Sequence, residues 1–146
     1  MAILGGGPGG GGPTGSTNPF TGGQTSLDYM GNGVWAGWSG AVSATSGSDG
    51  TLYEFTSPSV GLRVIGSFSF DENNLNANAF LGLKIKLNTI TIYNMRVKKS
   101  ADAGFTNLDS DAISFVIPAF TEVLITSITD DGDNIATQLN LVCDQI

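Results

Sequence analysis

The stretch from Leu81 to Val97, LGLKIKLNTITIYNMRV, constrains the fold most strongly. It predicts two β-strands joined by the turn residues Asn88 and Thr89. Alternate residues of a strand share a face. A two-residue turn then gives mostly apolar cross-strand pairs on one face, namely Leu87 with Ile90, Ile85 with Ile92 and Leu83 with Asn94. The opposite face is predicted to pair Lys86 with Thr91, Lys84 with Tyr93 and Gly82 with Met95.

The rest of the chain after Asp28 repeats this pattern of short apolar alternation between turn signals. The predicted strands outside the hairpin are Val34–Ser43, Thr51–Thr56, Leu62–Phe70, Ala112–Ile117, Thr121–Thr129 and Asn134–Cys143. No helical periodicity of useful length is present. The pattern predicts an all-β, antiparallel β-sandwich of about eight strands, of jelly-roll type, with an up-and-down barrel as the alternative.

The same alternation predicts which side chains are buried. The predicted core includes Ile85, Ile92, Phe115, Ile125 and Leu139. Trp35 and Trp38 differ in parity, so we expect them on opposite faces of their strand, with one of them exposed or covered by another element.

Residues 1–27 differ in composition from the predicted domain at 28–146. They contain ten of the 21 glycines, three of the five prolines and no charged residue. Glycine and proline disfavour helix and strand interiors, so we expect an extended N-terminal arm. Two interpretations stay open, a disordered tail or an arm that lies on a neighbouring subunit. In the second, Ile3, Leu4 and Phe20 are the candidate anchors.

Charge and cysteine content limit the classes of function. The formal net charge is −7, there is no histidine, and Cys143 is the only cysteine. Nonspecific nucleic-acid binding, an internal disulfide and a cysteine-rich metal site are therefore not expected. We predict no cofactor, no metal and no catalytic residues. No apolar run reaches the length of a membrane span, and the start of the chain lacks the features of a secretory signal, so synthesis in a cytoplasm is expected.

The basic residues are clustered. All six lie between Arg63 and Lys99, and five fall in a 16-residue stretch without an acidic residue, namely Lys84, Lys86, Arg96, Lys98 and Lys99. One interpretation is a solvated sheet face that resists edge aggregation. The other is a docking patch for an acidic protein surface, with Lys84, Lys86 and Tyr93 as candidate partner-binding residues.

Two further groups of residues are candidates for ligand binding. The turn Asp130–Asp133 offers oxygen ligands but lacks the spacing of a calcium loop, and it needs no metal as a turn. The aromatic residues Trp35, Trp38, Tyr53 and Tyr93 suit either a sugar-binding platform or a core and interface role.

The segment from about Phe80 to Cys143 contains LKIKLNTITIY, ISFVIPAFTEVLITSI and ATQLNLVC, and an arm rich in glycine and proline precedes it. In this order the chain resembles the small jelly-roll decoration, or cement, proteins of tailed-bacteriophage capsids. The resemblance implies a non-enzymatic virion protein on the outer capsid surface. Such a protein would bridge subunits of the major capsid protein or another shell protein as a homo-dimer or homo-trimer.

Two other functions remain as alternatives. The first is a carbohydrate- or receptor-binding β-sandwich module of a virion. The second is a hydrolase on a jelly-roll scaffold, which the absence of histidine and of a nucleophile motif disfavours.

Overall fold

The computed structural model describes residues 27–70, 74–100 and 111–146, and these form β-strands joined by turns and loops. The strands are β1 (Asp28–Gly31), β2 (Val34–Trp38), β3 (Val42–Ala44), β4 (Gly50–Thr56), β5 (Leu62–Phe70), β6 (Phe80–Leu87), β7 (Ile90–Lys98), β8 (Asp111–Ile117), β9 (Glu122–Thr129) and β10 (Ile135–Gln145). In these three ranges, no helix has the length and apolar character needed to cross a membrane.

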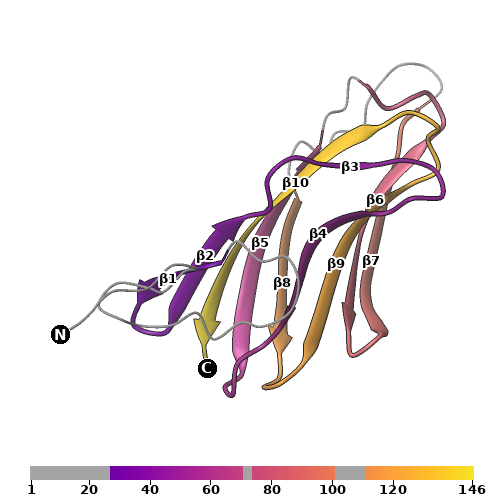
Figure 1. Ribbon diagram of the computed structural model, residues 1–146. Helices are drawn as coiled ribbons and strands as arrows, with labels where there is room; N and C mark the ends of the chain where they lie inside the picture. The colour runs from indigo at the N-terminus through magenta and orange to yellow at the C-terminus, as the bar shows by residue number, and fades with distance from the viewer. Residues whose placement is uncertain (1–26, 71–73, 101–110) are drawn as a thin grey trace.

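The strands form two antiparallel sheets (Figure 1). The six-stranded sheet has the order β1-β2-β10-β5-β8, with β3 also paired to β10. The four-stranded sheet has the order β4-β9-β6-β7. The strand pairs are nested along the chain, because β6 pairs with β7, β5 with β8, β4 with β9 and β2 with β10.

Successive pairs of this nested ribbon alternate between the two sheets, which is the wrapping of a jelly roll. The predicted antiparallel sandwich is therefore confirmed. The eight strands of the wrap correspond to the eight predicted ones, and β1 and β3 are short additions to the six-stranded sheet.

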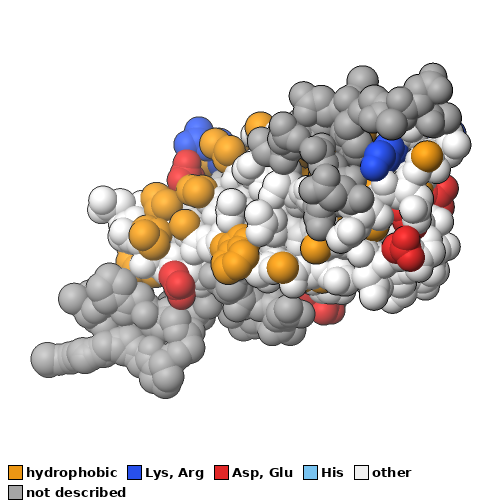
Figure 2. Space-filling view, turned by 90° about the horizontal axis from the view of Figure 1, so that it is seen from above, with side chains coloured by type: hydrophobic (Ala, Val, Ile, Leu, Met, Phe, Trp, Pro, Cys, Tyr) orange, Lys and Arg blue, Asp and Glu red, His pale blue; other side chains and the backbone are white. Residues whose placement is uncertain are grey.

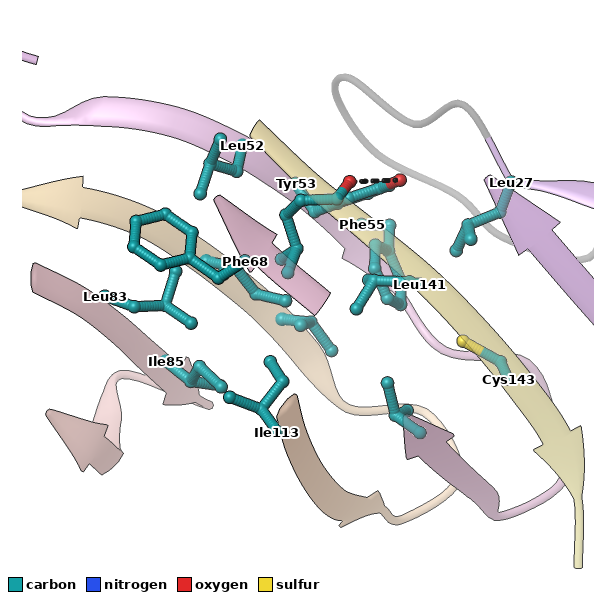
Figure 3. Close-up of a cluster of buried hydrophobic side chains, with 14 of the residues drawn as sticks. Leu27, Leu52, Tyr53, Phe55, Phe68, Leu83, Ile85, Ile113, Leu141 and Cys143 are labelled. Carbon is teal, nitrogen blue, oxygen red and sulfur yellow. Dashed lines mark hydrogen bonds between the residues drawn. The ribbon is translucent and has the colours of Figure 1, made fainter. Parts of the chain in front are cut away.

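The core lies between the sheets and is built by alternate residues of each strand (Figure 3). On β10, for example, Leu139, Leu141 and Cys143 are buried, while the residues between them are more exposed. Tyr53 is fully buried, and its hydroxyl donates a hydrogen bond to the Leu139 carbonyl oxygen at 3.4 Å. Full burial of each large apolar side chain stabilises the fold by about 1.5–3 kcal/mol.

The structure tests the five predicted core positions. Ile85, Ile125 and Leu139 are fully buried, as predicted. Phe115 is only partly buried and packs against the core. Ile92 is 44% exposed, so the prediction that it is buried is wrong.

A β-bulge in the hairpin explains the error at Ile92. The turn at Asn88 and Thr89 and the first pairs, Leu87 with Ile90 and Lys86 with Thr91, agree with the predicted register. The register then shifts, and Ile85 pairs with Tyr93. Because a bulge inserts one unpaired residue, Ile92 is excluded from the ladder and every later residue of β7 changes face.

The predicted single strand Val34–Ser43 is two strands, β2 and β3. Gly40 lies between them with a φ of 76°, a left-handed conformation that interrupts extended backbone and suits glycine. The opposite placement of the two tryptophans is confirmed, because Trp35 is 6% exposed and Trp38 is 54% exposed.

The first described residue, Leu27, belongs to the predicted arm. Leu27, the last residue of that arm, is buried in the core of the sandwich. Ile3, Leu4 and Phe20 lie outside the described residues. The division between an arm and a domain stays a prediction, with the qualification that Leu27 packs as part of the sandwich.

Candidate partner-binding surface

Lys84 and Lys86 lie on the outer face of the four-stranded sheet. Their neighbours on β6, Leu83 and Ile85, are fully buried, and alternation turns the two lysines away from the core. The Lys84 Nζ atom lies 3.2 Å from the Asp49 Oδ2 atom. Asp49 therefore partly neutralises the charge of Lys84 within the chain.

Lys86 borders a groove on the same outer face, with a volume of about 260 Å³. The groove is lined by Glu54, Phe55, Thr56, Lys86, Thr89, Glu122, Val123 and Leu124. In the described part of the chain, Lys86 has no ion pair with Asp or Glu. The groove thus combines one lysine, two carboxylates and apolar side chains.

The sheet order explains why sequence reasoning missed the two glutamates. Strand β9 lies between β6 and β4, so Glu122 and Glu54 reach the lysine side of the sheet from segments distant along the chain. The outer face is therefore of mixed charge, although the hairpin alone is basic. No local sequence signal marks this pairing.

Other residues of the basic cluster have partners within the chain. The Arg96 guanidinium lies 4.4 Å from the centre of the Phe80 ring, a cation–π distance. Lys99 Nζ donates a hydrogen bond to the Leu75 carbonyl oxygen at 2.7 Å. Some residues of the basic cluster therefore make contacts that stabilise the fold, and others keep their charge accessible to a partner.

Tyr93 does not lie beside Lys84 as the predicted register required. It pairs with Ile85 after the bulge, is partly buried and packs against the core. The structure brings Lys84 and Lys86 together on one face and places Tyr93 on the other. Partner binding by these three residues, and by Ile3, Leu4 and Phe20, stays a prediction.

The Asp130–Asp133 turn is held by internal hydrogen bonds. The buried Asp131 carboxylate accepts bonds from the Asn76 backbone N–H and side-chain Nδ2, both at 2.6 Å, and from the Asp133 backbone N–H at 3.0 Å. Asp130 Oδ1 accepts a bond from the Phe80 backbone N–H at 2.8 Å. Within the described ranges, no three His, Cys, Asp or Glu residues are grouped to hold a metal ion.

Two buried titratable groups have pKa values that are shifted in opposite directions. Burial by itself raises the pKa of Asp131, but hydrogen bonds from Asn76 and Asp133 and the charge of Lys99 outweigh it, so the pKa is lowered. Burial and the neighbouring Asp144 charge raise the pKa of the Cys143 thiol to about 12. Cys143 is thus a protonated core residue at neutral pH.

The four aromatic residues considered for a sugar platform do not share a surface. Trp35 and Tyr53 are buried, Tyr93 packs against the core, and Trp38 is exposed. The Trp38 indole Nε1 donates a hydrogen bond to Gln138 Oε1 at 3.2 Å, which fixes the ring over the six-stranded sheet. The interpretation of these four residues as one sugar-binding platform is therefore wrong.

Comparison with known proteins gives similarity only among solved structures. No family model matches the sequence, and no curated protein matches it. Among solved structures, the chain is similar to the VP2 protein in the crystal structure of an infectious bursal disease virus VP2 subviral particle. The identity is 16% and the TM-score is 0.49, over 77% of this chain and 32% of that chain. This chain thus spans about a third of the length of its structural neighbour.

Proposed function

We propose that this chain is a non-enzymatic structural protein of a virion that decorates or cements the outer surface of a capsid. It bridges neighbouring subunits of the major capsid protein or another shell protein, and acts as a homo-dimer or homo-trimer. The resemblance to decoration proteins of tailed bacteriophages, which lies in the segment from Phe80 to Cys143, supports this proposal.

The single observation that carries a binding role is the exposure of large apolar side chains on both sheets. Trp38, Ile65, Val116 and Val142 project from the six-stranded sheet, and Ile90 and Ile92 project from β7, with between 43% and 68% of each surface accessible. Groups of such residues on a folded surface mark protein interaction sites. Figure 2 shows hydrophobic side chains gathered on the visible face, with Lys and Arg in separate small groups.

We assign the shell-binding role to the outer face of the four-stranded sheet and to the arm. The groove beside Lys86 offers a lysine and two glutamates to the complementary charges of a partner. Lys84 lies next to it on the same strand. Ile3, Leu4 and Phe20 of the arm supply apolar anchors on a neighbouring subunit.

The location on a particle is tested on virions from the source of this sequence. Mass spectrometry of purified particles is expected to find the chain in many copies. Cryo-electron microscopy is expected to place the sandwich on the outside, across the boundary between shell subunits. Absence from the particles, or density only inside the shell, overturns the proposal.

The role of Lys86 is tested by charge reversal. In cosedimentation with particles that lack the protein, Lys86→Glu is expected to weaken binding at low salt, and wild-type binding is expected to fall as salt rises. Lys98→Glu is the matched control, because it makes the same charge change on an exposed residue away from the groove. Salt-independent binding, or equal loss in both variants, contradicts the role of Lys86.

A further inference from the structure

A diagonal stripe of four exposed apolar side chains crosses the outer face of the six-stranded sheet. The stripe consists of Trp38 on β2, Val142 on β10, Ile65 on β5 and Val116 on β8. These side chains are 54%, 43%, 51% and 53% exposed, respectively. They come from four strands that are adjacent in the sheet order.

The strand register shows that the stripe is continuous. Val142 pairs directly with Ile65. Trp38 pairs with Asn140, two residues from Val142, and Val116 pairs with Arg63, two residues from Ile65. Diagonal neighbours of this kind lie about 7–8 Å apart, within reach of long side chains. All four residues therefore lie on one face and form one surface.

The charge on this face is nearly balanced. Arg63 and Asp144 lie beside the stripe and form an ion pair with an N–O distance of 2.6 Å. Asn140, which pairs with Trp38, and Ser67, which pairs with Asn140, are neutral. Asp28, on the edge strand β1, pairs with Ala36 at the margin. Two copies with a net charge of −7 each repel one another, and this face allows approach with little added repulsion.

The area of the face fits a stable dimer. Strands β2, β10, β5 and β8 contain 5, 11, 9 and 7 residues. At a spacing of about 4.8 Å and a rise of about 3.4 Å per residue, they cover a flat area of roughly 500 Å². A standard interface buries about 800 Å² of accessible surface on each partner, and a pleated sheet exposes more than its flat area. Sheets pack face to face with their strands aligned to within about 30°. The stripe is thus large enough to be the centre of a sheet-on-sheet contact.

From these observations we infer that a second copy of this chain binds the stripe, giving a two-fold dimer through the outer faces of the six-stranded sheets. Trp38, Ile65, Val116 and Val142 of each copy meet at its centre. The contact leaves the opposite, four-stranded sheet with Lys84 and Lys86 accessible. The inference deepens the proposed function, which includes a homo-dimer, by assigning the surface that joins the two copies. Its test uses the isolated protein, so its failure is distinguishable from a failure of the proposed role on a capsid.

The test uses the full-length protein without particles. Sedimentation equilibrium between about 1 µM and about 1 mM is expected to show a monomer–dimer equilibrium. Ile65→Asp places an unpaired charge at the centre of the contact and is expected to raise the dimer dissociation constant at least about 30-fold. Val142→Lys adds a positive charge to the same contact and is also expected to raise the dissociation constant. A loss of dimer in both variants shows that the cause is the burial of a charge and not the sign of the change in net charge.

The matched control is Ile92→Asp. It makes the same change at an isoleucine of similar exposure on the other sheet, and it is expected to leave the dissociation constant within about twofold of wild type. Circular dichroism checks that each variant is folded. A wild-type protein that stays monomeric throughout the concentration range overturns the inference. An equal loss of dimer in Ile92→Asp also overturns it.

Tryptophan fluorescence gives an independent measurement. The chain has two tryptophans, Trp35 in the core and Trp38 in the stripe. Acrylamide reaches the exposed indole in the monomer, so quenching is expected to decrease as the protein concentration rises through the dissociation constant. In Ile65→Asp, quenching is expected to stay at the monomer level. Quenching of the wild type that does not change while dimer forms shows that the contact lies elsewhere and overturns the assignment.

Discussion

Asp131 connects two loops that are far apart in the sequence. Its carboxylate accepts hydrogen bonds from Asn76, in the loop before β6, and from Asp133, in the turn before β10. A buried carboxylate is tolerated only when such donors satisfy it. The energetic role of Asp131 is therefore to hold these two loops in place.

We predict that Asp131→Asn lowers the free energy of unfolding by about 1–3 kcal/mol at pH 7, because at least one buried donor loses its acceptor. The native pKa is lowered, whereas the unfolded chain titrates near about 3.9. Ionised Asp131 thus contributes stability above that pH, and the contribution is lost as the pH falls through the native pKa. The difference between the two proteins should shrink in acid.

Urea unfolding at a series of pH values measures this difference. Glu54→Gln serves as the control, since it removes one negative charge from an exposed side chain and should change stability little. A deficit of Asp131→Asn that persists unchanged well below the native pKa would show that the cause is packing and not charge.

The bulge in the β6–β7 hairpin gives Ile85 and Ile92 different burial. Ile85 is fully buried and Ile92 is 44% exposed, although simple alternation pairs them on one face. We predict that Ile85→Ala costs about 2–5 kcal/mol through lost burial and the cavity that remains. Ile92→Ala should cost less than about 1 kcal/mol. Thermal or urea unfolding compares the pair, and equal losses would argue against the bulge.

The turn of the same hairpin is stabilised from outside. Asn88 and Thr89 both have positive φ, at 48° and 71°, as a type I′ turn requires. The Asn88 backbone N–H donates to the Glu122 carbonyl oxygen, and the Asn88 side-chain oxygen accepts from the Glu122 N–H, each at 2.9 Å. These contacts hold a β-branched Thr89 in a conformation that it disfavours.

We predict that Thr89→Gly raises the free energy of unfolding by roughly 0.5–1 kcal/mol. Glycine removes a left-handed cost of about 1–2 kcal/mol, and its larger entropy in the unfolded chain offsets part of this gain. Thr91→Gly, in the adjoining strand, should instead lower stability. A lower melting temperature for Thr89→Gly than for wild type would contradict this account of the turn.

These elements show what alternation in a sequence can predict. Alternation predicts the eight strands of the jelly roll, the turn at Asn88 and the burial of Ile85, because each depends on neighbouring residues. It did not predict the bulge at Ile92 or the break at Gly40, because one extra residue or one positive φ leaves no mark on the apolar pattern. Tyr93 was placed on the wrong face for the same reason.

The distribution of charge on the surface depends on contacts between strands that are distant in the sequence. The sequence showed five basic residues without an intervening acid, but the sheet order brings Glu122 and Glu54 beside Lys86. Nested pairing also aligns Trp38, Val142, Ile65 and Val116 from four separate strands. Neither surface could be predicted from sequence, because both depend on which strands become neighbours.

We predict that the N-terminal arm contributes much of the attachment to the particle. The twenty-six residues before Leu27, if extended, reach up to about 86 Å at roughly 3.3 Å each, enough to cross onto a neighbouring subunit. The segment is uncharged, so placing it against a foreign surface requires no desolvation of ions. If buried in apolar pockets, Ile3, Leu4 and Phe20 would each stabilise the contact by about 1.5–3 kcal/mol.

Deletion of residues 1–26 tests this attachment and retains Leu27, which belongs to the core. The shortened protein is expected to have a melting temperature close to that of the full chain but much lower occupancy on particles, measured by quantitative gel analysis. A full-length variant with Ile3, Leu4 and Phe20 all replaced by serine keeps the length of the arm and should lose occupancy similarly, because the apolar anchors provide the contact. Occupancy equal to wild type in the deletion would mean that the sandwich alone attaches the protein.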